Sequence, residues 1–300
     1  MKVIEAENLR KYYKRSKGID GVTFSVEEGD FFGFIGPNGA GKSTTIRTLL
    51  GLIEKDGGEA RVFGLDAGRD REGILARVGY MPSDTIFYSG MKVRDVIDLS
   101  ARLRKRDCKK EAAVLCERLD LDINKKVGAL SFGNRKKVGI VCALQHSPDL
   151  CILDEPTSGL DPLMQREFFN ILQEKNREGM TVFLSSHVLS EVGRHCRSAA
   201  IIRGGSVIAC DSVRTLGHTG VKKVSLSGFT GEITLEGARD IKREGENLRF
   251  LYSATPKELL SALSGLEFSD VNISDPDLEE VFMHYYVKGE NCNDLISSRA

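Results

Sequence analysis

The sequence predicts an α/β fold, because short apolar runs alternate with helical patterns along much of the chain. One run, residues 31–35, leads into a glycine-rich turn and a helical pattern, and a second, residues 150–153, ends in Asp154 and Glu155. Residues 181–184 form a third run of this kind. Apolar runs of this length are typical of strands that are buried on both faces. We therefore expect a parallel sheet with helices between its strands.

The glycine-rich turn matches the phosphate-binding pattern G-x-x-x-x-G-K-[ST]. A strand, such a turn and a helix start direct several backbone N–H groups and the positive end of the helix dipole at one point. Lys42 can then reach the β- and γ-phosphates of a nucleotide, and the Ser43 hydroxyl suits Mg²⁺. An ordinary glycine-rich turn that matches by chance is the alternative. The expected nucleotide-binding residues of this loop are Gly36, Pro37, Asn38, Gly39, Ala40, Gly41, Lys42, Ser43 and Thr44.

Two adjacent carboxylates, Asp154 and Glu155, follow the second apolar run. Unpaired buried charge is costly, so a buried strand that ends in two acids indicates a metal or phosphate nearby. We expect Asp154 to hold Mg²⁺ together with Ser43, and Glu155 to orient or deprotonate the water that attacks the γ-phosphate. The alternative is a strand-to-loop junction with two solvated acids.

A second candidate anion site lies between these motifs, in the segment Leu130-Ser131-Phe132-Gly133-Asn134. Ser131 occupies an N-cap position before a helical pattern, with a glycine close by. One of the two anion sites would be redundant if a single chain supplied both to one phosphate. Two chains arranged head to tail would instead let each close the nucleotide pocket of the other.

Taken in order, these motifs resemble those of the ATP-binding subunit of ATP-binding cassette (ABC) transporters, over roughly the first two-thirds of the chain. Residues 130–134 stand where that family has its signature, and residues 158–161 match its D-loop. His187 matches the switch histidine, and Tyr13 falls where the family has an aromatic residue that stacks on adenine. Five ordered motifs are far more specific than any one of them.

The resemblance implies a P-loop NTPase (RecA-like) core with an antiparallel β edge and an inserted helical subdomain, followed by a small α+β C-terminal extension. It implies ATP and Mg²⁺ as cofactors, with Lys42, Glu155 and His187 in the catalytic role. Tyr13 would stack on adenine, and Ser131 and Gly133 would contact the nucleotide of a second copy or of a paralogous ATPase subunit. The other expected partner is an integral-membrane permease of the ABC-2 exporter type.

Two departures from the family pattern stand out. Ser83 occupies the position of a glutamine that usually reaches Mg²⁺ and the attacking water and couples the site to the membrane partner. A serine is too short for a direct metal contact and would act through a further water. In the signature, Phe132 replaces a glycine and Asn134 replaces a glutamine, while Ser131 and Gly133 are retained. We expect an active site of a variant type.

The expected ATP-binding domain covers residues 1–217, with its helical subdomain at about 84–146, and an accessory domain covers residues 218–300. In the accessory domain we expect strands at 221–226, 232–235, 248–253 and 268–273, and a helix at 256–263. A last helix is expected to open at Asp275-Pro276 and to include Leu278-Glu279-Glu280-Val281-Phe282. This ending resembles that of subunits that serve ABC-2 permeases.

Composition sets further limits. The 300 residues carry 43 basic and 43 acidic side chains, so no overall field favours nucleic acid, and we expect no nucleic-acid partner. The basic run 135–137 is expected to be a solvated helix face. Seven scattered cysteines without a C-x-x-C pair favour reduced thiols. No apolar stretch is long enough to span a membrane, so we expect a cytoplasmic protein held at the cytoplasmic face of a membrane by its permease.

Two other functions compete with transport. A soluble ABC-type ATPase that remodels protein or nucleic acid would need no permease, but such proteins carry two cassettes or a long coiled coil, and neither is present. A small-molecule kinase would leave residues 131–134 and His187 unexplained. The transported compound cannot be inferred, because its passage belongs to another polypeptide.

Overall fold

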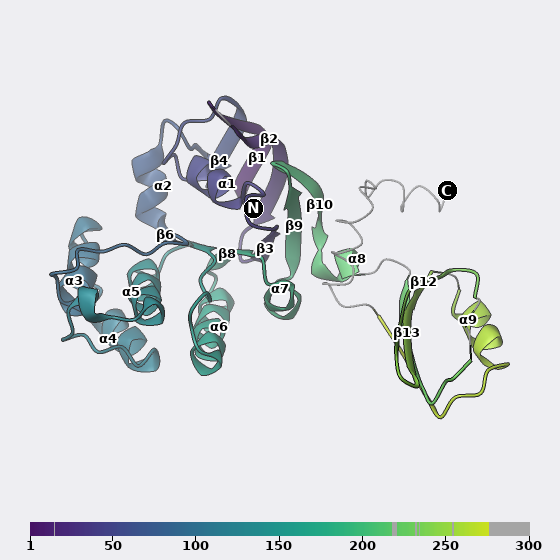
Figure 1. Ribbon diagram of the computed structural model, residues 1–300. Helices are drawn as coiled ribbons and strands as arrows, with labels where there is room; N and C mark the ends of the chain where they lie inside the picture. Colours follow the sequence, from purple (N-terminus) through teal and green to yellow (C-terminus); the bar gives the residue numbers. More distant parts are fainter. Residues whose placement is uncertain (15, 218–220, 232, 234, 254, 276–300) are drawn as a thin grey trace. The chain divides into compact units, whose positions relative to one another are not determined.

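The computed structural model describes residues 1–14, 16–217, 221–231, 233, 235–253 and 255–275 (Figure 1). The chain divides into two compact units, residues 1–211 and 212–300. The domain boundary expected from the sequence, between residues 217 and 218, stays a prediction.

A six-stranded sheet in the order β10-β9-β3-β8-β7-β6 forms the centre of the first unit. The pairs from β9 to β6 are parallel, and every residue of β3, β7 and β8 is buried. Its strands are β3 (Phe31–Ile35), β6 (Val78–Met81), β7 (Leu150–Asp154), β8 (Thr181–Ser186), β9 (Ser198–Arg203) and β10 (Ser206–Ser212). The predicted α/β fold is confirmed.

A second, antiparallel sheet in the order β2-β1-β4-β5 forms the predicted β edge. It consists of β1 (Lys2–Tyr13), β2 (Ser16–Glu27), β4 (Gly57–Val62) and β5 (Leu65–Asp66). Phe24 of β2 joins the two sheets, because its ring centroid lies 5.7 Å from that of Phe32 and 6.0 Å from that of Phe183. The strand β3, which leads into the phosphate-binding loop, is therefore anchored in an aromatic core.

The described residues of the first unit include seven α-helices, and α3, α4 and α5 gather beside one another in Figure 1. These three helices lie in the chain between the neighbouring strands β6 and β7, which makes them the predicted helical insertion. Within the described residues, no helix combines the length and the apolar character needed to cross a bilayer. The helices are α1 (Lys42–Leu49), α2 (Arg71–Arg77), α3 (Val93–Leu103), α4 (Lys109–Arg118), α5 (Phe132–Leu144), α6 (Pro162–Arg177) and α7 (Leu189–His195), with a 3₁₀ turn, η1, at Val127–Ala129.

The second unit contains a four-stranded antiparallel sheet in the order β12-β13-β11-β14. Leu259 and Leu263 of α9 are buried in one core with strand residues such as Val224 and Phe250. Thr255 caps α9 by accepting a hydrogen bond from the backbone N–H of Glu258. The elements are α8 (Val213–Gly217), β11 (Lys222–Ser227), β12 (Ala238–Glu244), β13 (Asn247–Tyr252), α9 (Pro256–Leu263) and β14 (Asp270–Ser274).

Two expectations for this unit differ from the structure. The strand expected at 232–235 is wrong at its described residues, because Ile233 and Leu235 reach the core from irregular backbone. Their alternation with polar residues imitates a strand. In contrast, the sequence predicts no strand at β12, because Ile241 is its only long apolar residue and its neighbours are charged. In the structure this side chain is 48% exposed. The last helix, expected from residue 275, lies almost wholly outside the described residues.

Candidate active site

The phosphate-binding loop connects β3 to α1, as the sequence predicts. Gly39 and Gly41 have φ angles of 80° and 107°, a region that side chains disfavour. Gly41 is the N-cap of α1 and provides no side-chain cap, so the first N–H groups of the helix remain available to an anion. Lys42 is buried, and its ammonium donates to the carbonyl oxygens of Gly36 at 2.5 Å and Pro37 at 3.2 Å. The lysine therefore bends back across the loop.

Gly39→Ala tests the conformational demand of this loop. A Cβ at Gly39 would meet no atom within 4 Å, so only the positive φ opposes a side chain there. We expect a loss of about 1–2 kcal/mol in unfolding free energy, the cost of left-handed backbone for an L-residue. Gly90→Ala is the matched control, because Gly90 also has open space and is not among the glycines of positive φ. A melting temperature that falls no further for Gly39→Ala than for Gly90→Ala would contradict this argument.

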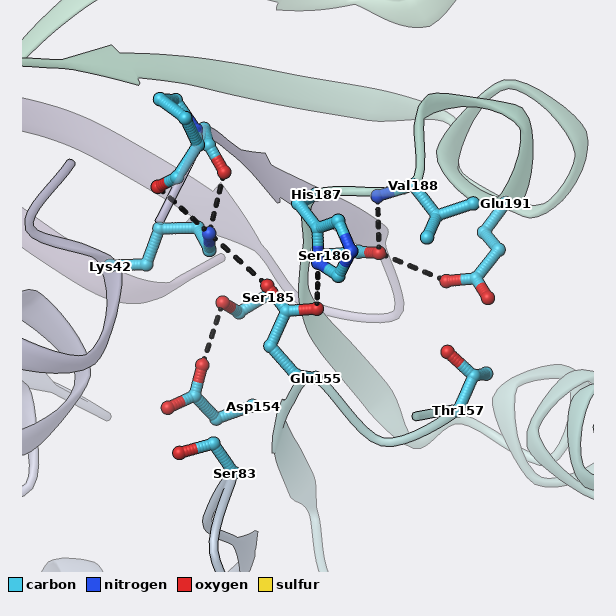
Figure 2. Close-up of polar contacts among 12 residues, drawn as sticks. Lys42, Ser83, Asp154, Glu155, Thr157, Ser185, Ser186, His187, Val188 and Glu191 are labelled. Atoms are coloured by element: carbon cyan, nitrogen blue, oxygen red, sulfur yellow. Dashed lines mark hydrogen bonds and ion pairs between the residues drawn. The ribbon is translucent and has the colours of Figure 1, made fainter. Parts of the chain in front are cut away.

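The side chains of Lys42, Glu155 and His187 converge at the end of the central sheet (Figure 2). The Lys42 ammonium lies 3.1 Å from Glu155 Oε1, and His187 Nδ1 lies 2.6 Å from Glu155 Oε2. Among the described residues, Glu155 Oε1 is buried without a hydrogen bond, so Lys42 is its charge partner. The carboxylate of Glu155 thus connects the phosphate-binding loop to His187, which is about half exposed.

Backbone geometry sets the directions of the Glu155 and His187 side chains. Glu155 has a φ of 50°, which costs a residue other than glycine about 1–2 kcal/mol and turns the chain sharply after β7. Its N–H donates to the carbonyl oxygen of Ser185 at 3.0 Å. Beyond His187, the hydroxyl of Ser186 accepts from the N–H of Val188 at 3.0 Å and donates to Glu191 at 2.9 Å (Figure 2). These bonds fix the chain on both sides of His187.

Asp154 is fully buried and makes hydrogen bonds through both carboxylate oxygens. The hydroxyl of Ser43 donates to Oδ2 at 2.6 Å, and the hydroxyl of Ser185 donates to Oδ1 at 2.9 Å. The sequence predicts that Ser43 and Asp154 act together, and the structure places them in contact although they lie 111 positions apart in the sequence. Ser185 was not expected in this site. Its position opposite Asp154 in the parallel register of β7 and β8 explains the contact.

A cavity of about 350 Å³ opens beside the loop. Tyr13, Ser83 and Glu155 line it together with residues 37–39 and 41–44 of the loop. Gly18 brings the chain close to the Tyr13 ring, because a Cβ at Gly18 would lie 2.9 Å from a ring atom. Gly36 and Ala40 lie beneath this surface and are buried. Tyr13 therefore lines the same cavity as the phosphate-binding loop, and its stacking on adenine stays a prediction.

The signature segment does not reach this cavity. Ser131 is the N-cap of α5, as predicted, and its hydroxyl accepts from the N–H of Asn134 at 3.3 Å. A Cβ at Gly133 would lie 2.3 Å from the carbonyl oxygen of Gly159, so these two segments touch. Neither Ser131 nor Gly133 is among the described residues that line the cavity. Within one chain, the exposed Ser131 is therefore separate from the cavity beside the phosphate-binding loop.

The basic run 135–137 corrects one expectation. Lys136 is fully buried and Lys137 is 7% exposed, so the run is not a solvated face. Lys136 donates to the carbonyl oxygens of Ser83 at 2.6 Å and Glu155 at 2.9 Å. The spacing carried the signal, because Ile140 and Ala143 follow Lys136 at four and seven positions and so share its helix face. A run of three basic residues is typical of a solvated helix face, and this charge conceals the apolar spacing around Lys136.

Comparison with known proteins decides the family. A family model described as "ABC transporter" matches residues 19–158, and a model described as "AAA domain, putative AbiEii toxin, Type IV TA system" matches residues 126–192. The bacitracin transport ATP-binding protein BcrA of Bacillus licheniformis is 36% identical over 213 residues, which are 69% of this chain and 68% of BcrA. The chain belongs to the ATP-binding subunits of ABC transporters.

Other ABC transporter subunits and structures agree. The linearmycin resistance ATP-binding protein LnrL of Bacillus subtilis (strain 168) is 29% identical over 303 residues and covers 94% of this chain, with 97% of LnrL matched. A solved structure described as the ATP-binding subunit of an ABC transporter has a TM-score of 0.68 and 29% identity, over 71% of this chain and 91% of that one. The ABC subunit therefore binds and hydrolyses ATP to energise a transporter. This family assignment favours transport over the soluble and kinase alternatives.

Proposed function

We propose that two copies of this ABC subunit, or one copy and a paralogous subunit, enclose two ATP molecules and drive an exporter permease. Each ATP would lie between the phosphate-binding loop of one copy and Ser131 and Gly133 of the other. The observation that carries the proposal is the separation of the two anion sites: Ser131 is exposed, and it does not line the cavity that holds Lys42. A single copy therefore leaves each of its two half-sites incomplete.

Within each ATP site, this chain's residues divide the work of hydrolysis. The backbone N–H groups of the loop and Lys42 would bind the β- and γ-phosphates and offset charge as it develops. Glu155 would accept a proton from the attacking water, and its unbonded Oε1 is an available acceptor once Lys42 turns to the phosphate. His187 would contact the γ-phosphate from the position that its bond to Glu155 already gives it. Tyr13 would stack on adenine.

Ser43 and Asp154 suit Mg²⁺. A hydroxyl and a carboxylate are the hard oxygen ligands that this ion prefers, and it usually takes one or two protein ligands together with substrate phosphates. Among the described residues there is no group of three His, Cys, Asp or Glu side chains that could hold a metal, which agrees with a site completed by ATP. The ion would supply charge neutralisation at the phosphates. Ser83 lines the same cavity and would act through water.

Mixing two inactive variants tests the composite site. Ser131→Arg keeps the loop and blocks the signature, whereas Lys42→Ala keeps the signature and disables the loop. Each variant alone is expected to hydrolyse ATP very slowly. An equimolar mixture is expected to regain phosphate release well above the sum of the two, because a mixed pair restores one intact site. The measurement is steady-state phosphate release after mixing at a concentration that supports pairing.

The control mixture pairs Ser131→Arg with the double variant Lys42→Ala/Ser131→Arg, which offers no intact signature. No regain is expected there. If both mixtures stay as slow as the separate variants although every variant is folded, the proposal of a composite site is wrong. The ATPase activity of the unmodified chain is a separate measurement and does not depend on this result.

The permease would dock on a groove of about 1150 Å³ that is lined by residues of α2, α3 and the segment before α3. Ile86, Tyr88 and Leu103 line it and are 87%, 78% and 76% exposed. Exposed apolar side chains gathered in a groove are typical of a protein contact. The segment that supplies Ile86 also carries Ser83, which lines the ATP cavity. A cytoplasmic segment of the permease placed in this groove would therefore sit close to the catalytic site.

The direction of transport and the permease type are inferred together. One relative is named for bacitracin transport and another for linearmycin resistance, and a transporter provides resistance by moving a compound outward. The ending 278–282 favours an ABC-2 permease, although it lies outside the described residues.

The subunit would then lie at the cytoplasmic face of the membrane, with residues 1–217 as the ATP-binding domain, a helical subdomain at about 84–146, and residues 218–300 as the accessory domain. Co-purification of a membrane permease with the tagged chain tests this.

A further inference from the structure

Lys136 occupies a position that neither the family motifs nor the proposed roles explain. It is fully buried, yet its ammonium donates to two backbone carbonyl oxygens, those of Ser83 at 2.6 Å and Glu155 at 2.9 Å. The ring of Phe132 lies 5.6 Å from the same nitrogen. Burial lowers the pKa of Lys136, while Asp154, Asp84 and Glu155 favour its charged form. A buried charge is costly, so these contacts have to compensate for it.

The two acceptors belong to separate parts of the site. Ser83 follows β6 and lines the ATP cavity, and Glu155 follows β7 (Figure 2). Lys136 itself lies on α5, two positions after the signature segment 130–134. A hydrogen bond to a charged donor is stronger than one between neutral groups. The ammonium thus connects the loop after β6, the helix that carries the signature, and the turn that carries the expected catalytic carboxylate.

The backbone of Glu155 needs such support. Its φ of 50° is disfavoured for any residue with a side chain, and strained backbone persists only where its surroundings hold it. The carbonyl oxygen of Ser185 accepts from the N–H of Glu155, and Lys136 donates to the Glu155 carbonyl. Both polar groups of this residue are thereby fixed. The direction of its carboxylate, toward Lys42 and His187, follows from that fixed backbone.

We propose that Lys136 is a positioning residue for ATP hydrolysis, which holds Glu155 in its left-handed conformation and ties it to the loop of Ser83. The proposal rests on the catalytic role proposed for Glu155. Both hydrogen bonds of the Lys136 ammonium go to backbone carbonyl oxygens, and within the described residues Lys136 does not line the ATP cavity. Removal of its ammonium therefore acts on turnover through the direction of Glu155, while ATP binding by the loop is retained.

The test is a double-mutant cycle of Lys136→Met and Glu155→Gln in the full chain, with kcat and the Kd for ATP measured for each variant. Lys136→Met alone is expected to lower kcat by about 100-fold, the loss that a misplacement of about 1 Å causes. The Kd for ATP should change by less than about threefold, well below the tenfold change that would indicate a lost binding contact. In the Glu155→Gln background, Lys136→Met should change the residual rate by less than about threefold, because the carboxylate that it positions is already absent.

Lys137→Met is the matched control, because Lys137 is the next residue of α5 and is also buried. It is expected to keep the wild-type kcat. Three results would overturn the proposal: a Lys136→Met variant with wild-type kcat, an equal loss of kcat in both backgrounds, or a loss of ATP affinity that parallels the loss of kcat. If the methionine prevents folding, Lys136→Ala, which also removes the N–H donors, enters the same cycle with the same criteria.

The outcome of Glu155→Gln alone separates this inference from the proposed function. If Glu155→Gln turns over as fast as the wild type, the role proposed for Glu155 is wrong. If Glu155→Gln is slow but the cycle is additive, only the positioning role of Lys136 is wrong.

Discussion

Glu155→Gln is expected to slow ATP turnover by about 10²–10⁴-fold, the contribution that a positioned general base typically makes. A neutral amide keeps the size and shape of the side chain but no longer accepts a proton from water. The Kd for ATP should not increase. The Glu155 carboxylate pairs with Lys42 at 3.1 Å, and a nucleotide has to replace that pairing. A glutamine competes less strongly for the lysine.

The same variant should accumulate a two-copy complex in ATP and Mg²⁺, because the γ-phosphate that bridges the copies is no longer removed. Size-exclusion chromatography and phosphate release measure the two effects. Glu178→Gln, which removes an exposed carboxylate after α6, is the control and should behave as the wild type. Unchanged turnover in Glu155→Gln would exclude this residue as the base. A chain that stays monomeric in ATP while turnover is abolished would count against the clamp, provided that it pairs without its permease.

Lys42→Ala is expected to weaken ATP binding by about 10- to 100-fold, since a hydrogen bond to a charged group contributes ~1.5–3 kcal/mol. Two causes add. The phosphates lose an ammonium, and the loop loses the bonds from Lys42 to the carbonyl oxygens of Gly36 and Pro37 that help to shape it. In addition, the partly buried carboxylate of Glu155 loses its charge partner, so repulsion between Glu155 and the γ-phosphate is no longer offset.

Isothermal titration with a non-hydrolysable ATP analogue measures this loss. Lys55→Ala is a suitable control, because Lys55 pairs with Asp66 at 3.6 Å on the surface, where such pairs contribute little. An affinity for the analogue that is equal in Lys42→Ala and Lys55→Ala would remove the assignment of the phosphate-binding loop. The combination Lys42→Ala/Glu155→Gln should recover part of the affinity, since it also removes the unpaired carboxylate.

Much of the first unit could be predicted because its signals are local. The run Phe31–Ile35 forms β3, and the glycine pattern after it forms the loop. Ser131 forms its N-cap because a serine before a helical pattern satisfies an N–H at the helix start. In the second unit, Pro256–Leu263 forms α9 as expected. Each of these features depends on residues within a few positions of one another.

Other features could not be predicted in this way. The charged strand β12 forms because β13 offers it an unpaired edge, which no pattern within β12 reveals. Lys136 is buried because α5 packs between the loop of Ser83 and the turn of Glu155, and the contact to the latter spans 19 positions. A basic run on an isolated helix is normally solvated. Here the neighbours of the helix reverse that preference.

The sequence by itself determined the kind of ligand, the order of the motifs and the strands and helices that carry them, because phosphate binding and capping depend on short spacings. The tertiary structure decided which charges meet. Lys42 pairs with Glu155, and Ser43 and Ser185 share Asp154, because parallel strands bring the ends of β3, β7 and β8 to one edge of the sheet. Only the tertiary structure shows that Ser131 lies outside its own chain's cavity, and that a buried lysine donates to the carbonyl oxygen of the expected base.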